Sequence, residues 1–133
     1  MAEKLYTIPV NDAFDEGSEC PVCSMFRKLE NDAVEFMMGP SYMEDDIRME
    51  TDELGFCKRH MDILSLQKNR LGLALILKTH LDRQRREAME VSKKPVKAAA
   101  LLKKPEENEI SLWAKKKNCS CYICKRIDLT FPH

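Results

Sequence analysis

Apolar residues recur every three or four positions along much of the chain, a spacing that places side chains on one face of an α-helix. The clearest case covers 21–38, and Gly39 followed by Pro40 ends it. Its apolar stripe consists of Val22, Phe26, Leu29, Ala33, Phe36 and Met37. This pattern predicts an all-α protein.

Three further helices are predicted after this break. Ser41, with Glu44 three residues later, can cap a helix that ends at Gly55. A third helix begins near Cys57, and a fourth covers about 70–91 and opens with LGLALILK, a run that we expect in the core. Together the four helices predict a small helical bundle.

The length of 133 residues corresponds to one small domain, and the 4 glycines and 6 prolines leave few turn-forming residues. We divide the chain into a helical metal-binding module at 1–91, a linker or loose hairpin at 92–110, and a partial second C-x-x-C element at 111–133. Two Lys-Lys-Pro sequences in 92–110 mark the linker.

Charge is balanced overall, with 22 basic and 22 acidic residues, but it is divided unevenly along the chain. Residues 1–55 contain 14 acidic and 4 basic residues, whereas 56–133 contain 8 acidic and 18 basic residues. The two halves can therefore neutralise each other within the fold. Alternatively, the basic and aromatic residues of 113–126 can bind nucleic acid.

The chain contains six cysteines, and its start has neither the basic region nor the apolar core of a signal peptide. No apolar run approaches the roughly 18 residues of a membrane span. We therefore expect a cytoplasmic protein without a membrane segment. Because the cytosol keeps thiols reduced, metal binding or redox chemistry is favoured over a disulfide framework.

The cysteine spacing favours a metal. Cys20 and Cys23 form a C-P-V-C element, and Cys57 and His60 lie in G-F-C-K-R-H. Each pair stands where a helix should begin, and a C-x2-C pair with a C-x2-H pair supplies the four ligands of tetrahedral zinc. The sequence therefore predicts a zinc site at helix N-termini. An iron–sulfur cluster, a redox dithiol and buried structural cysteines are the alternatives.

A second cluster contains Cys119, Cys121 and Cys124 and is one ligand short. ECPVCSMFRKL (19–29) aligns with SCYICKRIDLT (120–130), which indicates an internal repeat. His133 can complete this possible second site, or a neighbouring chain can, giving a homodimer; free thiols are the remaining alternative. His80 lies on an apolar helical face, where a single hydrogen bond usually satisfies the ring, so we do not expect it to be a ligand.

Four sequences taken in order, TIPVNDAF (7–14), ECPVC (19–23), GFCKRH (55–60) and LGLALILK (71–78), resemble an uncharacterised bacterial family of unknown function. That family combines C-P-x-C and G-F-C-x-x-H elements with a second C-x-x-C. Its members continue to another G-F-C-x-x-H-like element, so the resemblance implies a short or truncated member. It also implies that Cys20, Cys23, Cys57 and His60 bind a metal.

The same ligand set bears on function. Four protein ligands leave no open coordination position for a substrate, and no Ser-His-Asp set, phosphate-binding glycine loop or H-E-x-x-H motif accompanies them. We therefore expect a non-catalytic zinc protein that acts as a protein-interaction module. Nucleic-acid binding, and thiol redox or metal sensing, are the alternatives.

Overall fold

The computed structural model describes residues 7–94 and 108–130, and all regular structure in these ranges is helical, which confirms the predicted all-α class. No helix there is long and apolar enough to cross a membrane. The elements in order are α1 (Ile8–Asp15), α2 (Pro21–Met38), the 3-10 turn η1 (Pro40–Met43), α3 (Asp45–Leu54), α4 (Lys58–Ser65), α5 (Arg70–Ser92), α6 (Glu109–Asn118) and α7 (Tyr122–Thr130).

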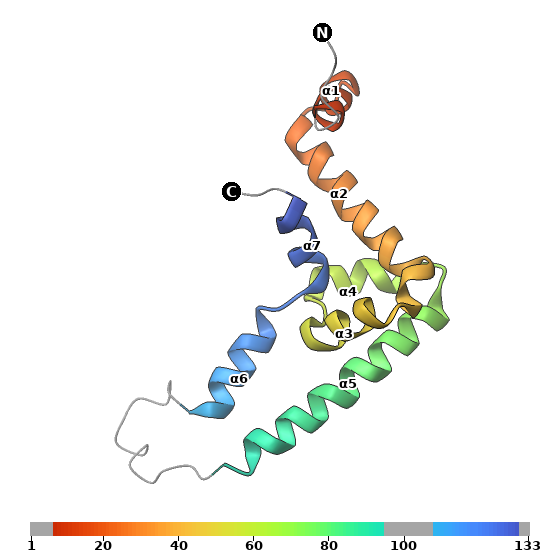
Figure 1. Cartoon of the computed structure of the whole chain (residues 1–133). Helices are drawn as coiled ribbons and strands as arrows, with labels where there is room; N and C mark the ends of the chain where they lie inside the picture. Colours follow the sequence, from red (N-terminus) through yellow and green to blue (C-terminus); the bar gives the residue numbers. More distant parts are fainter. Residues whose placement is uncertain (1–6, 95–107, 131–133) are drawn as a thin grey trace.

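Two long helices, α2 and α5, diverge from a central region that contains α3 and α4 (Figure 1). The short helix α1 packs on the outer end of α2, and α6 packs on the outer part of α5. The last helix, α7, returns to lie beside α2. The first and last helices of the described chain therefore both pack against α2.

The hydrophobic core contains residues from five helices, and α7 contributes three buried side chains to it, next to the four from α2. Its fully buried side chains include Met37 of α2, Leu64 of α4, Ile76 of α5 and Ile123 of α7. The other members are Ala33, Val34, Met38, Ile47, Cys121, Tyr122 and Ile127. Residues 121–127 thus share one core with the helices that precede them.

Helix boundaries agree with the sequence in three of four cases. The predicted helices at 21–38, near Cys57 and at 70–91 correspond to α2, α4 and α5. The helix expected to be capped by Ser41 instead begins at Asp45, because Pro40–Met43 forms a 3-10 turn first and Ser41 is buried in it. This correction shortens α3 but leaves its end at Gly55 unchanged.

The buried face of α2 differs from the predicted stripe. Ala33 and Met37 are buried as expected, whereas Val22, Phe26 and Phe36 are exposed. Val22 lies in the outer half of α2, which extends beyond the central helices and packs on α1 (Figure 1). The rings of Phe26 and Phe36 are covered only in part, by the guanidinium groups of Arg59 and Arg126. Periodicity identified the helix but could not reveal how much of its length is covered.

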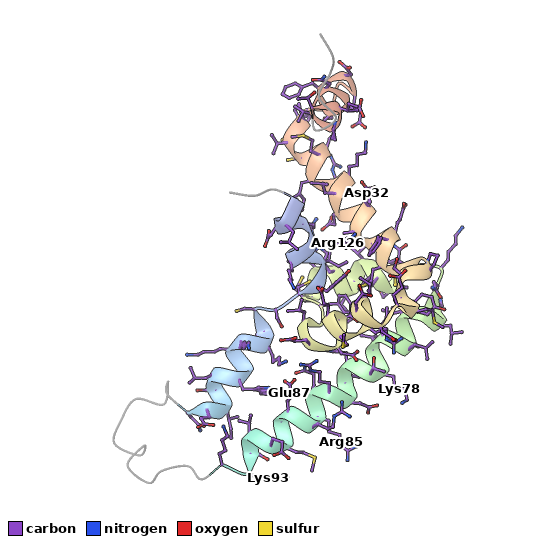
Figure 2. The ribbon with its side chains drawn as sticks, in the orientation of Figure 1. Asp32, Lys78, Arg85, Glu87, Lys93 and Arg126 are labelled. Carbon is purple, nitrogen blue, oxygen red and sulfur yellow. The ribbon has the colours of Figure 1, made fainter. Side chains whose placement is uncertain are left out.

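The start of α5 is less buried than LGLALILK suggested, since Ile76 is fully buried but Leu71 is 69% exposed. The later part of α5 is charged and packs against α6 through Glu87, which Figure 2 labels. Glu87 accepts hydrogen bonds from Trp113 Nε1 at 3.2 Å and from Lys117 Nζ at 2.8 Å. Of the predicted linker 92–110, residues 95–107 lie outside the described residues.

Candidate metal centre

Four side chains from two distant parts of the chain converge on one point. The ligand atoms of Cys57, His60, Cys121 and Cys124 all lie within 4.8 Å of one another, and the described ranges contain no second group of this kind. His60 Nδ1 is 3.2 Å from Cys57 Sγ, 3.3 Å from Cys121 Sγ and 3.4 Å from Cys124 Sγ. The imidazole nitrogen is therefore in contact with all three sulfurs.

Both halves of this cluster use the start of a helix. Cys57 is the N-cap of α4, its carbonyl accepts the first helical hydrogen bond from Met61 N–H at 2.9 Å, and His60 lies within the next turn. Cys121 directly precedes α7 and its carbonyl accepts in the same way at 3.0 Å, with Cys124 in the first turn. An x2 spacing at a helix start directs two side chains toward one point.

Three hydrogen bonds hold these halves in register. The end of α3 offers three successive carbonyls, those of Glu53, Leu54 and Gly55. They accept hydrogen bonds from Lys117 Nζ at 3.1 Å, from the hydroxyl of Ser120 at 2.7 Å and from the backbone N–H of Tyr122 at 2.9 Å, respectively. The segment that carries Cys121 is thereby fixed next to the loop that carries Cys57.

Gly55 is the residue on which this register depends. It ends α3 with φ +62° and ψ −151°, a conformation that is almost restricted to glycine. A Cβ there would lie 2.5 Å from His80 Cε1. His80 Nδ1–H donates to the Asp52 carbonyl at 2.9 Å, so this ring is satisfied by one hydrogen bond, as the sequence analysis expected.

A buried carboxylate orients the histidine. His60 Nε2 lies 3.0 Å from Glu30 Oε1, so Nε2–H donates to Glu30 and leaves Nδ1 free to face the sulfurs. Glu30 also accepts two hydrogen bonds from Arg59, at 2.8 and 2.9 Å. The Arg59 guanidinium holds the pKa of Glu30 below its usual range, with His60 adding to the effect. Glu30 therefore stays ionised beside the histidine.

The electrostatics of the sulfurs favour a cation. Burial, together with the neighbouring sulfurs of Cys121 and Cys57, raises the pKa of Cys124 to about 12. Three thiolates in one partly buried group repel each other, and a bound cation removes that cost by taking all three as ligands. The cluster is thus a set of soft ligands that are stable together as anions only around positive charge.

The geometry fits a single tetrahedral ion. With metal–sulfur bonds of about 2.3 Å and metal–nitrogen bonds of about 2.0–2.1 Å, the ligand atoms of such a site lie roughly 3.5–3.8 Å apart. The separations of 3.2–3.4 Å around His60 Nδ1 are close to this and need only a small outward shift. The cluster can therefore hold a metal ion with three sulfur ligands and one nitrogen ligand.

The structure groups the ligands expected from the sequence differently. It keeps Cys57 with His60 but combines them with Cys121 and Cys124 rather than with the pair Cys20 and Cys23. That first pair lies at the start of α2, outside the cluster. Cys119 is exposed and also outside it. His133, the other expected ligand of the second site, lies outside the described residues.

Glu30 and Arg59 were not identified from the sequence. The available signal was that Glu30 falls one helical turn before Ala33 and Val34, on the face of α2 that is buried. A carboxylate in that position is rarely left unpaired, so it indicates a buried polar partner.

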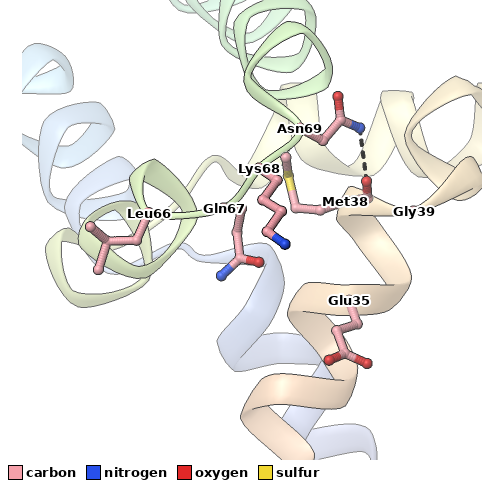
Figure 3. A pocket seen from close by; sticks show the side chains of 7 residues that line it. All are labelled: Glu35, Met38, Gly39, Leu66, Gln67, Lys68 and Asn69. Carbon is pink, nitrogen blue, oxygen red and sulfur yellow. Dashed lines mark hydrogen bonds between the residues drawn. The ribbon is translucent and has the colours of Figure 1, made fainter.

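Figure 3 shows an open pocket elsewhere, between the end of α2 and the α4–α5 turn, where Asn69 donates to the Met38 carbonyl at 2.8 Å.

Comparison with known proteins places the chain in a family. A family model described as a family of unknown function matches residues 1–133. The chain belongs to this family, DUF6062. No curated protein and no solved structure matches the chain. Membership of DUF6062 confirms the resemblance to an uncharacterised family of unknown function.

Proposed function

We propose that the protein is a non-catalytic zinc-binding helical module that presents its outer helices to a protein partner. The observation that carries this proposal is the closed set of Cys57, His60, Cys121 and Cys124, whose ligand atoms lie within 4.8 Å of one another. Zinc bound there ties α4 to α7, and hence the middle of the chain to its last described helix. Such a site contributes directly to folding stability.

The donor set and its size support zinc over iron–sulfur chemistry. Three thiolates and one imidazole are a common structural zinc set. An iron–sulfur cluster contains several metal and sulfide atoms, which separate its cysteine ligands more widely than a single ion does. The short distances around His60 Nδ1, 3.2–3.4 Å to the three sulfurs, therefore favour one mononuclear ion.

The ligand count supports a structural role. Catalytic zinc sites keep a coordination position for water or substrate, whereas this set supplies four protein ligands. The buried Glu30 contact on His60 resembles the outer contacts that fix ligand orientation in metal sites. A set with four protein ligands and a fixed histidine orientation stabilises a fold rather than activating water.

The exposed apolar residues of α1 and of the N-terminal part of α2 support binding to a protein partner. Phe14 of α1 is 63% exposed and Val22 of α2 is 65% exposed, and Phe26 one turn further along is also exposed. Exposed apolar groups on adjacent elements are typical of interaction surfaces when they gather in one region. The helices α1 and α2 pack against each other here, so the three side chains belong to one part of the molecule.

Charge pairing within the fold makes nucleic-acid binding the weaker alternative. Arg59 pairs with Glu30 at 2.8 Å, and Lys125 pairs with Glu50 at 3.3 Å, so both pairs join the basic half to the acidic half. Basic residues of the second half thus neutralise acidic residues within the fold, as the charge division of the sequence allowed. Flow-through on heparin at moderate salt is the expected result, and retention would favour nucleic acid.

Elemental analysis of protein purified under reducing conditions tests the zinc assignment. We expect Cys57→Ser to lose about one zinc ion per chain relative to the parent protein, because each closed set holds one ion. Cys119→Ser is the matched control, since this exposed cysteine lies outside the cluster, and it should lose none. Unchanged zinc in Cys57→Ser, or iron in place of zinc, contradicts the assignment.

A further inference from the structure

A second thiol pair has the same local geometry as the ligands of the metal centre. Cys20 is the N-cap of α2, and its carbonyl accepts from Ser24 N–H at 3.1 Å, as the Cys121 carbonyl does at the start of α7. Cys20 Sγ also accepts from Cys23 N–H at 3.3 Å. Cys20 and Cys23 thus repeat, at the start of α2, the arrangement that supplies two ligands at the start of α7.

This pair is accessible, and the described ranges supply it with no further metal ligand. Cys23 is exposed, and Cys20 is half-buried. The hydrogen bond from Cys23 lowers the pKa of Cys20, while the same contact raises the pKa of Cys23. No third histidine, cysteine or carboxylate in the described part of the chain joins them in a metal-binding group. Two sulfurs fill only half of a tetrahedral site.

The surface around the pair is both apolar and acidic. Val22 lies between the two cysteines, and Phe14 on α1 is likewise exposed. Asp15, Glu16 and Glu19 lie just before the pair in the chain and are exposed. Exposed Arg27 follows the pair and donates to the Cys23 carbonyl at 3.5 Å, so acidic groups outnumber it here. Two such surfaces could bury apolar area against each other, but their carboxylates and thiolates would repel. A cation between them is what makes that contact favourable.

We propose that Cys20 and Cys23 bind a zinc ion together with the same two residues of a second copy of the chain. A two-fold axis places identical patches opposite each other, so a pair of thiols on that axis meets its own copy and completes a four-sulfur tetrahedron. The proposal names a partner for the interaction surface of the proposed function and rests on that part of it. It does not require the cluster at Cys57 to be occupied.

The competing ligands within the chain support this choice of partner. Cys57 and His60, which the sequence spacing matched to the first pair, already face Cys121 and Cys124. Cys20 and Cys23 are held at the outer end of α2, away from the central helices (Figure 1). The pair therefore lies where another chain can reach it, at the outer end of α2.

Native mass spectrometry with elemental analysis, in a phosphine reductant that prevents disulfides, tests the proposal. The zinc-loaded parent protein should be a dimer with about three zinc ions, one in each closed cluster and one shared. Cys20→Ser combined with Cys23→Ser should give a monomer with about one zinc ion per chain and an unchanged helical circular dichroism spectrum. Cys119→Ser should remain a dimer, because Cys119 belongs to neither set.

Three outcomes overturn the proposal. They are a parent protein that is monomeric at any zinc content, a dimer that persists in the double serine variant, and a dimer that a chelator cannot dissociate. Failure of the zinc assignment at Cys57 looks different, because Cys57→Ser would then keep all its zinc while the parent dimer stayed dependent on Cys20 and Cys23. The two proposals are therefore separable in one set of measurements.

Discussion

Two C-x2-C pairs in this chain begin helices in the same way but have different surroundings. Cys121 is buried in the hydrophobic core and Cys124 joins it beside His60. Cys20 and Cys23 begin a helix whose first half projects from the body with little cover (Figure 1). Similar local sequence therefore yields a closed site in one place and an open pair in the other. The difference is made by the partners that the fold brings to each.

The Cys121–Cys124 pair is completed by the loop that carries Cys57, and the carbonyls next to this loop hold α7 in place. The end of α3 accepts three hydrogen bonds from 117–122, which fixes α7 against that loop. Nothing equivalent among the described contacts ties the start of α2 to the same loop. Ligand spacing thus defines which residues can bind a metal, whereas tertiary contacts determine which pairs share one.

The sharpest test of the comparison replaces the second cysteine of each pair with serine. Cys124→Ser should release zinc and detach α7 from α4, because structural zinc contributes on the order of 10 kcal/mol of apparent binding free energy at neutral pH. We expect a large fall in melting temperature by circular dichroism. Cys23→Ser is the matched control and should leave the melting temperature of the monomer nearly unchanged. Equal effects would contradict the assigned difference between the pairs.

This contrast also shows how far the sequence alone could go. The 3.6-residue period predicted α2, α4 and α5, and the residue types and spacing identified Cys57 and His60 as candidate ligands. Both C-x2-C pairs matched the zinc spacing equally well, and spacing contains no information about which pair approaches residue 57. That choice depends on hydrogen bonds between segments more than sixty residues apart, such as Ser120 to Leu54.

Other features were hidden for a related reason. Val22 and Phe26 fit the apolar period of α2, but the period could not show that the outer end of the helix has few neighbours. Glu30 interrupts the buried face, and its role became visible only when His60 and Arg59 were placed beside it. Local patterns predict elements well, whereas burial and pairing depend on the whole fold.

Glycine substitutions test the backbone next to each thiol pair: Gly55 beside the metal centre and Gly17 near Cys20. Gly55→Ala should destabilise the protein by about 2–3 kcal/mol, because φ +62° with ψ −151° is strained for alanine and the added Cβ would lie 2.5 Å from His80 Cε1. Gly17→Ala is the control near the open pair. Its φ is +65°, but its Cβ would meet nothing within 4 Å, so only about 1 kcal/mol is expected. Urea unfolding measures both.

The Gly55 variant should also weaken zinc binding, since the Gly55 carbonyl anchors Tyr122 next to Cys121. Competition with a chromophoric chelator would detect the change. A Gly55→Ala protein that unfolds like the Gly17→Ala protein, with unaltered zinc affinity, would show that the register of α7 does not depend on this turn.

Glu30→Gln tests whether the buried carboxylate orients the metal ligand. Glutamine has the same shape but no charge, so His60 Nε2–H loses its ionised acceptor at 3.0 Å. Outer contacts of this kind typically change metal affinity about 10- to 100-fold, and we expect a loss in that range. Glu35→Gln, exposed on the same helix, should have no effect. Equal affinities in the two variants would contradict an orienting role for Glu30.

The smallest expected effect concerns Glu87, which holds α6 against α5 and so guides the chain toward α7. Burial raises its pKa, but hydrogen bonds from Arg83, Lys117 and Trp113 outweigh that effect and lower the pKa from 4.5 to about 2. The folded state therefore favours the ionised form. Stability from this group is fully present above the unfolded value of 4.5 and is lost as the pH falls toward about 2.

Glu87→Gln should accordingly cost about 1 kcal/mol near neutral pH, as expected for loss of partly exposed charged hydrogen bonds. The difference from the parent protein should shrink as the pH falls from 4.5 toward about 2, where the parent carboxylate also becomes protonated. Acid releases zinc from both proteins alike, so the difference between their unfolding curves isolates Glu87. Glu90→Gln is the control, because Glu90 pairs only with the neighbouring Lys93 among the described ion pairs.

Zinc stoichiometry in Glu87→Gln then connects this contact to the comparison between the two thiol pairs. The segment that carries Cys121 is held by hydrogen bonds to the carbonyls of 53–55, and these bonds are separate from the α5–α6 contact at Glu87. The variant should therefore keep its zinc while losing stability. Lys117 connects the two contacts, since it binds both Glu87 and the Glu53 carbonyl. Arg83 adds a second connection, because it pairs with Glu87 and with the Glu53 carboxylate. Loss of zinc in Glu87→Gln would mean that α6 helps to deliver Cys121, and closure of the site would then depend on more than the α3 turn.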